Sequence, residues 1–380
     1  MLKNLIAALV VLLSLCLSIS ANAEDLPYEY DLEKQFDILG IDEIADIMPD
    51  ESKALMAKSG LAEVSVKSLL QLSPEGFFKA VWAMLLETIR YPIKMLGVFI
   101  GVMVLCALIG GIRNSTQDEE LSQIFSVVVV LCMLSSVVTP VMDCISKTVL
   151  AINNASTFML GYIPAFAAAI VAAGQPISGT TYNMLLFSAC QIVSQVVSNM
   201  LLPIMSIYLA LAIVGSLSLT LGISSICAAV KRVVTWSLGF LLTVFVGILS
   251  VQTMVSGSSD ALGIKAGKFV ISSFVPIVGS ALSEAMIAAQ GCLRLIRTSV
   301  GAFGIAAALF LFAPIFINVL SWYAVTGITG VIADILQIKE ISEMMKGCIS
   351  VLGILISFLL CYALLMIVSI TVVMVAGGIA

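Results

Sequence analysis

The 23 residues VLGILISFLLCYALLMIVSITVV, at positions 351–373, contain no charged side chain. A helix rises about 1.5 Å per residue, so roughly 20 apolar residues cross the roughly 30 Å hydrocarbon layer of a bilayer. This stretch is therefore long and apolar enough to be a transmembrane helix. Together with similar stretches elsewhere, it predicts an all-α fold, a polytopic α-helical membrane protein.

The other apolar stretches fall within a multi-pass transmembrane domain that we place at residues 95–380. Three of them are ambiguous: the short stretch that ends at residue 173, the polar one before Pro203, and the one that holds Pro276, Gly279 and Glu284 and could be re-entrant. We therefore expect seven to nine spans. The further candidates are 95–112, 124–142, 158–173, 184–201, 203–222, 233–251, 269–290 and 300–320.

The composition excludes several classes of protein. Hydrophobic residues make up 61% of the 380 residues and charged residues only 11%, whereas a soluble domain is roughly one quarter charged. The basic residues form no patch, so we expect no nucleic-acid partner. The chain has no histidine, and its nine cysteines include no CxxC pair, so we expect no metal, no cofactor and no catalytic site.

The N-terminus has the pattern of a cleavable signal peptide at residues 1–23. Lys3 precedes an apolar run at 5–19, and Ala21-Asn22-Ala23 has the small-x-small form of a cleavage site. A lipoprotein signal at Cys16 is disfavoured because the preceding residue is the bulky Leu15. An uncleaved anchor would leave the following residues on the same outer side.

Residues 24–94 follow the signal peptide and are therefore expected outside the cytoplasm, where their turn signals and helix starts predict a small helical region. This region is acidic, since more than half of the 23 acidic residues lie in it. Ser73 can cap a helix whose first position is Pro74, and an amphipathic helix is expected at 74–90. Its apolar face either lies in the membrane interface, docks a partner, or packs on its own small domain. That face consists of Phe78, Val81, Trp82, Leu85, Leu86 and Ile89.

Polar residues within apolar stretches are the remaining candidates for mechanism, because an unpaired polar group in hydrocarbon costs several kcal/mol. One stripe could line a polar pathway or make interhelical hydrogen bonds. It consists of Ser188, Gln191, Gln195, Ser198 and Asn199.

Two further features are weaker. Gly97 and Gly101 form a GxxxG pair that predicts close helix packing. Asp143, Glu284 and Asp334 are the acidic residues nearest to apolar stretches, and each either lies at a membrane edge or couples transport to protons or cations.

One stretch carries a family resemblance, together with the plan of signal peptide, acidic helical region and polytopic remainder. The residues of the stretch are Gly257-Ser258-Ser259-Asp260, Lys265, Lys268, Pro276, Gly279, Gly291 and Cys292. In their order and spacing, the chain resembles the stage III sporulation protein AE family. Ser280 departs from the family pattern, where a second glycine is expected.

The resemblance implies a membrane-embedded subunit of the channel-like, secretion-like complex that links mother cell and forespore and is needed for forespore development after engulfment. It implies a place in the mother-cell membrane, contact with membrane lipids, and binding of other subunits of the stage III complex through residues 24–94 and the extracytoplasmic loops. A homo-oligomer stays open. The alternative is a stand-alone transporter of a small solute, with Gln191, Gln195 and Asn199 along its path.

Overall fold

The computed structural model describes residues 47–58, 74–113, 119–196, 199–200, 202–217, 223–274 and 279–376. In these ranges all regular secondary structure is helical, which confirms the predicted all-α class. The signal peptide predicted at 1–23 and much of the acidic region lie outside the described residues and stay predictions. The helices are α4 (Asp50–Lys58), α6 (Pro74–Thr88), α7 (Arg90–Arg113), α8 (Glu119–Ala172), α9 (Pro176–Val196), α10 (Leu202–Leu217), α11 (Ile223–Phe274), α12 (Gly279–Ile335) and α13 (Lys339–Ala376).

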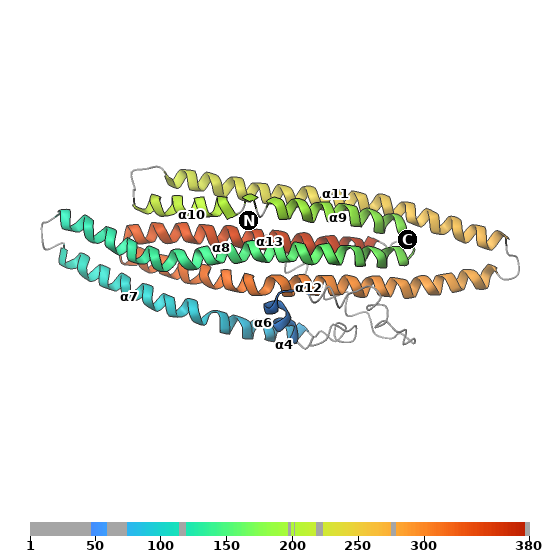
Figure 1. Ribbon diagram of the computed structural model, residues 1–380, viewed down its shortest axis with the longest axis horizontal. Coiled ribbons are helices and arrows are strands. Elements are labelled where there is room, and N and C mark those ends of the chain that lie inside the picture. The colour runs from blue at the N-terminus through green and yellow to red at the C-terminus, as the bar shows by residue number, and fades with distance from the viewer. Residues whose placement is uncertain are drawn as a thin grey trace.

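The long helices lie side by side in an elongated bundle (Figure 1). α13 lies inside the bundle, where it contacts α8, α10, α11 and α12. α7 follows one long edge, packed on α12 and α8, whereas α11 follows the opposite edge beside α9 and α10. The α7–α8 pair and the α11–α12 pair extend past the other helices at opposite ends of the bundle.

The described residues contain fewer separate long apolar helices than the expected number of spans, which stays a prediction. In the described residues, five helices are long and apolar enough to cross a membrane, and one shorter apolar helix lies at Pro203–Gly215. The expectation was seven to nine. The difference arises mainly because the predicted spans 124–142 and 158–173 belong to one 54-residue helix, α8. The five candidates are Lys79–Leu108, Met133–Ala172, Ser225–Gly263, Arg297–Ile335 and Lys339–Val372.

The polar stretch between those two predicted spans remains helical because it is packed inside the bundle. Cys144, Ile145 and Ile152 are fully buried there. Thr148 satisfies its hydroxyl within the helix, since Oγ1 donates to the Cys144 carbonyl oxygen at 2.7 Å. A polar interval in the sequence therefore marks buried helix here, and it does not mark a loop.

A further difference concerns the predicted span 269–290. α11 ends at Phe274 and α12 begins at Gly279, so this stretch is divided between two helices, and Pro276 lies in the undescribed residues between them. α11 and α12 then run back along each other (Figure 1). The described residues therefore form no single helix over 269–290, and the re-entrant alternative for this stretch stays a prediction.

Stacked aromatic rings fill the centre of the bundle. Tyr162 of α8 stacks between Phe158 and Phe166, with ring centroids 5.8 and 5.5 Å away. All three rings are fully buried. The Tyr162 hydroxyl donates to the Val300 carbonyl oxygen of α12 at 3.0 Å, so the ring is fixed at both its face and its tip. Gly304 of α12 leaves the space that this ring occupies.

Two tight turns join antiparallel helices, and each contains a residue with positive φ. Gly174, with φ of 83°, ends α8, and the Gln175 N–H donates to the Ile170 carbonyl oxygen at 3.2 Å. Gln337, with φ of 58°, ends α12, and the Ile338 N–H donates to the Ala333 carbonyl oxygen at 3.0 Å. Both are Schellman-type ends, which favour glycine at this position.

Gln337 is therefore a site where glycine should stabilise the protein. A side chain with a Cβ atom is strained in the left-handed region by about 1 kcal/mol, whereas glycine is not. We expect Gln337→Gly to be more stable than Gln337→Ala by about 1 kcal/mol in detergent-solubilised protein, measured by thermal unfolding. Both variants lose the same exposed side chain, so equal stability of the two would contradict strain at this turn.

Candidate functional site

A polar cluster lies where the α8–α9 turn meets α11, α12 and α13. Asp260 of α11 is 4% exposed, and its carboxylate accepts hydrogen bonds from the N–H groups of Ile177 at 3.1 Å and Ser178 at 2.9 Å. These are the second and third residues of α9, whose N–H groups have no partner within their own helix. Asp260 thus supplies from another helix the cap that a side chain before Pro176 would normally provide.

Arg297 of α12 ties the same turn to the end of α13. Its guanidinium donates to Gln175 Oε1 at 2.7 Å and to the carbonyl oxygen of Met374, and the side chain is 2% exposed. Asp260 of α11 and Arg297 of α12 therefore both hold the α8–α9 turn in place. Sequence reasoning found Asp260 as part of the family-like stretch but missed Arg297 and its partners. The signal was Gly174-Gln175-Pro176, a turn that leaves glutamine, a poor cap, directly before a helix.

Elsewhere in the family-like stretch, Ser258 Oγ and Ser259 Oγ donate to carbonyl oxygens of their own helix, those of Met254 at 2.7 Å and Val255 at 3.1 Å. Lys265 is exposed on α11, and Lys268 lies in α11. Pro276 falls outside the described residues, as stated above. Gly279 begins α12, and Gly291 and Cys292 lie within it. Asp260 is the member of this stretch to which the structure gives a role in packing.

The predicted polar stripe lies on the outer surface of α9. Ser188, Gln191 and Gln195 are exposed, and Ser188 Oγ donates to the Met184 carbonyl oxygen of its own helix at 2.8 Å. Asn199 is also exposed and donates from Nδ2 to Gln195 Oε1 at 2.9 Å, whereas Ser198 lies outside the described residues. The described part of the stripe therefore lines no path within the chain.

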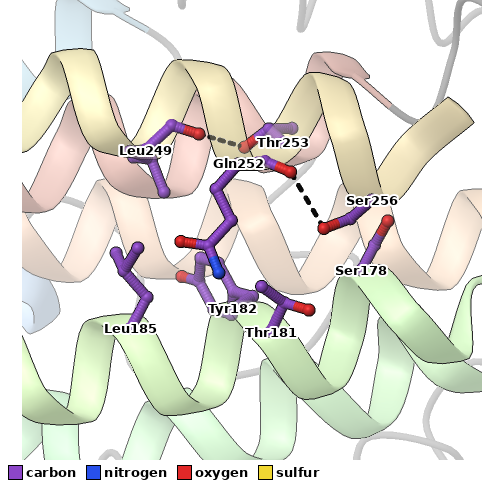
Figure 2. A pocket seen from close by; sticks show the side chains of 8 residues that line it. All are labelled: Ser178, Thr181, Tyr182, Leu185, Leu249, Gln252, Thr253 and Ser256. Carbon is purple, nitrogen blue, oxygen red and sulfur yellow. Dashed lines mark hydrogen bonds between the residues drawn. The ribbon is translucent and has the colours of Figure 1, made fainter.

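A small cavity opens between α9 and α11 (Figure 2). Its volume of about 20 Å³ is room for about one water molecule. Two of its hydroxyls bond to their own helices: Thr181 Oγ1 to the Ile177 carbonyl oxygen at 2.6 Å, and Thr253 Oγ1 to that of Leu249 at 2.7 Å. The Tyr182 hydroxyl is buried there and has no hydrogen-bond partner among the described residues. This cavity is too small for a solute. It is lined by Ser178, Thr181, Tyr182, Leu185, Leu249, Gln252, Thr253 and Ser256.

Two of the three acidic candidates sit in ion pairs at half-exposed positions. Asp143 lies 2.9 Å from Lys147 on the same face of α8. Asp334 lies 3.4 Å from Lys346 across the α12–α13 turn and accepts a hydrogen bond from Ser342 Oγ. The side chain of Glu284 is not among those described. In the described residues, no group of three or more potential metal ligands occurs.

The glycine pair expected to pack helices faces open space. A Cβ atom built on Gly97 or Gly101 would meet no atom within 4 Å. Close approach occurs instead at other glycines: a Cβ on Gly347 of α13 would lie 2.6 Å from Ala212 Cβ of α10. Packing at the GxxxG pair therefore stays a prediction about contacts outside this chain.

α6 begins at Pro74 as predicted, but its apolar face is only partly covered. α6 packs on α12, with Ala80 buried, while Trp82 and Leu86 are 62% and 50% exposed. α4 contacts both α6 and α12, and Lys58 lies 3.4 Å from Glu87. The described part of the N-terminal region is thus docked on the bundle, with an exposed apolar strip.

Comparisons with known proteins agree with the resemblance carried by the residues around Asp260. The family model of stage III sporulation protein AE matches residues 57–377. Stage III sporulation protein AE of Bacillus subtilis (strain 168) is 22% identical over 249 residues, a match that covers 66% of this chain and 62% of that relative. No solved structure matches the chain.

Proposed function

The chain belongs to the stage III sporulation protein AE family, and from this premise we propose that it is a membrane-embedded subunit of a complex that links the mother cell to the forespore. The family match over residues 57–377 is the observation that carries the proposal. Five long apolar helices support a multi-pass position, which we assign to the mother-cell membrane around the forespore. The role is needed for forespore development after engulfment.

The packing favours a scaffold or pore wall over a transporter complete in one chain. The bundle centre around Tyr162 is filled with aromatic rings, and the cavity between α9 and α11 holds about one water molecule. The polar stripe of α9 faces outward. A path for cargo would then run between subunits. We expect no catalytic turnover by the chain alone.

The N-terminal region is the proposed site of contact with other subunits of the complex. α4 and α6 are held against α12, which gives a fixed platform. Trp82 and Leu86 project from α6 next to the exposed charges of Lys79 and Glu87. Aromatic side chains with a polar rim are typical of protein interfaces.

Deletion of the gene in a spore-forming host tests the proposal. We expect normal vegetative growth, followed by small forespores and loss of late forespore-specific gene expression after engulfment. Complementation with the full-length gene should restore both. Normal spores after deletion, or a defect already present during growth on one nutrient, would reject the sporulation role and favour the solute transporter.

A further inference from the structure

Contacts between helices show which residues lie at the same depth along the bundle. On α8 and α12, Cys144 Sγ donates to Asn318 Oδ1 at 3.7 Å, and Tyr162 Oη donates to the Val300 carbonyl oxygen at 3.0 Å. The two contacts are 18 residues apart on each helix, from 144 to 162 and from 318 to 300. The two helices therefore run antiparallel, and their residues stay in the same register between the two contacts. Ser156 Oγ of α8 donates to the Cys190 carbonyl oxygen at 3.4 Å, which places α9 on the same scale.

At this depth, one segment of each of five helices contains no charged residue, and together these segments form a belt. The five helices are α8, α9, α11, α12 and α13. On α8 the belt begins after Lys147 and continues to the end of the helix, a distance of about 37 Å at 1.5 Å per residue. Hydrocarbon of about 30 Å fits inside it, with Lys147, Arg232, Asp260, Arg297 and Lys346 at its borders. On α12 the stretch without charge continues beyond the belt, as far as residue 333. The segments without Asp, Glu, Lys or Arg are 148–172, 176–196, 233–259, 298–317 and 347–376.

The α9 stripe lies inside this belt on its exposed side. Gln191 is next to Cys190, and therefore about 12 Å deeper than the level of Lys147. Exposed hydroxyls at similar depth donate to carbonyl oxygens of their own helices. Ser188 Oγ donates to the Met184 carbonyl oxygen, and Thr243 Oγ1 to that of Gly239, both at 2.8 Å. A glutamine amide carries two donors and an acceptor, and lipid can satisfy none of them.

We propose that the stripe of α9 pairs with the α9 stripe of a second copy of this chain. Copies inserted with the same orientation can be related by a twofold axis along the membrane normal, which brings Gln191 opposite Gln191 at equal depth. An amide is both donor and acceptor, so it is complementary to itself. A second copy therefore supplies both the donors and the acceptors that the stripe needs at this depth.

The neighbours of the stripe favour a narrow contact between two helices. Successive residues of a helix are turned by about 100°, so Phe187 lies on one side of the Ser188–Gln191–Gln195 ridge, while Ile192 and Val196 lie on the other. All three are exposed apolar residues. They can face lipid on both flanks of the pair, whereas a water-filled lumen would call for a wider polar face.

Cysteine crosslinking of the full-length chain in native membranes tests the contact. We expect Ser188→Cys to form a disulfide-linked dimer with copper phenanthroline at least fivefold above the chain without an added cysteine. Ile248→Cys, 52% exposed at comparable depth on α11, should stay at the background level. Background crosslinking at position 188, or equal crosslinking at both positions, would overturn the proposal.

Association measured by energy transfer between labelled copies in vesicles gives a second readout. Interhelical hydrogen bonds in membranes contribute modestly, so replacing Gln191 and Gln195 by leucine should weaken association about tenfold. Thr243→Leu removes an exposed polar group elsewhere in the belt and should leave association unchanged. Unchanged association after both glutamine replacements would overturn the proposed pairing of the two stripes.

Rapid reaction of Ser188→Cys with a membrane-impermeant maleimide would also overturn the proposal, because the stripe would then face water. Neither readout depends on sporulation.

Discussion

Replacing Asp260 by alanine is expected to lower the free energy of unfolding by about 3 kcal/mol. The change removes two hydrogen bonds to a buried carboxylate, from the Ile177 and Ser178 N–H groups, and leaves the first turn of α9 without a cap. Asp260→Asn retains one side-chain oxygen and should lose about half as much. The measurement is thermal unfolding in detergent of the unchanged protein and the two variants. Its readout is the labelling of the buried thiols of Cys144, Cys190 and Cys348, which become reactive on unfolding.

The control for this variant is the neighbouring residue. Ser259 is exposed and its hydroxyl bonds to the Val255 carbonyl oxygen of its own helix at 3.1 Å. Ser259→Ala should change stability by less than about 0.5 kcal/mol. If Asp260→Ala were no less stable than Ser259→Ala, the cap would not hold α9 in the folded protein.

The second large effect is expected at Gly304, where alanine should destabilise the protein by about 2–3 kcal/mol. A Cβ atom there would overlap the end of the Tyr162 ring, approaching Cε2 at 2.9 Å and the tip atoms more closely. The ring is stacked between Phe158 and Phe166 and cannot turn aside without breaking this packing. The same thiol-labelling measurement applies.

Gly327 provides the matched control on the same helix. A Cβ atom there would meet nothing within 4 Å, so Gly327→Ala should be neutral or should stabilise α12 by up to about 1 kcal/mol. Adding Tyr162→Phe to Gly304→Ala should cost less than the sum of the two single changes, because the overlap includes the hydroxyl. Strict additivity would show that the two residues do not compete for space.

The sequence predicted the fold class because apolar length is a local property. The 351–373 stretch lies within α13, and Pro74 begins α6 as expected. Two predicted spans share the single helix α8, because a polar stretch such as 143–157 can mark either a loop or a buried helix. Only the packing of Ile145 and Ile152 against other helices decides between the two.

The polar cluster shows the same limit at the level of single residues. The resemblance pointed to Asp260, but its partners Ile177 and Ser178 lie more than 80 positions away. Arg297 is likewise far from Gln175 in the sequence. Local pattern shows that a helix begins at Pro176 with no good cap before it. It does not show which distant side chain supplies that cap.

The place of α13 inside the bundle has a consequence for how the protein is made. Ribosomes produce α8, α10, α11 and α12 before the helix that each of them contacts. Until α13 is inserted, these four helices lie in the membrane without the helix that fills the space between them. The final arrangement is therefore reached only late in synthesis, and insertion factors that shield half-built bundles should matter more for this chain than for one assembled helix by helix.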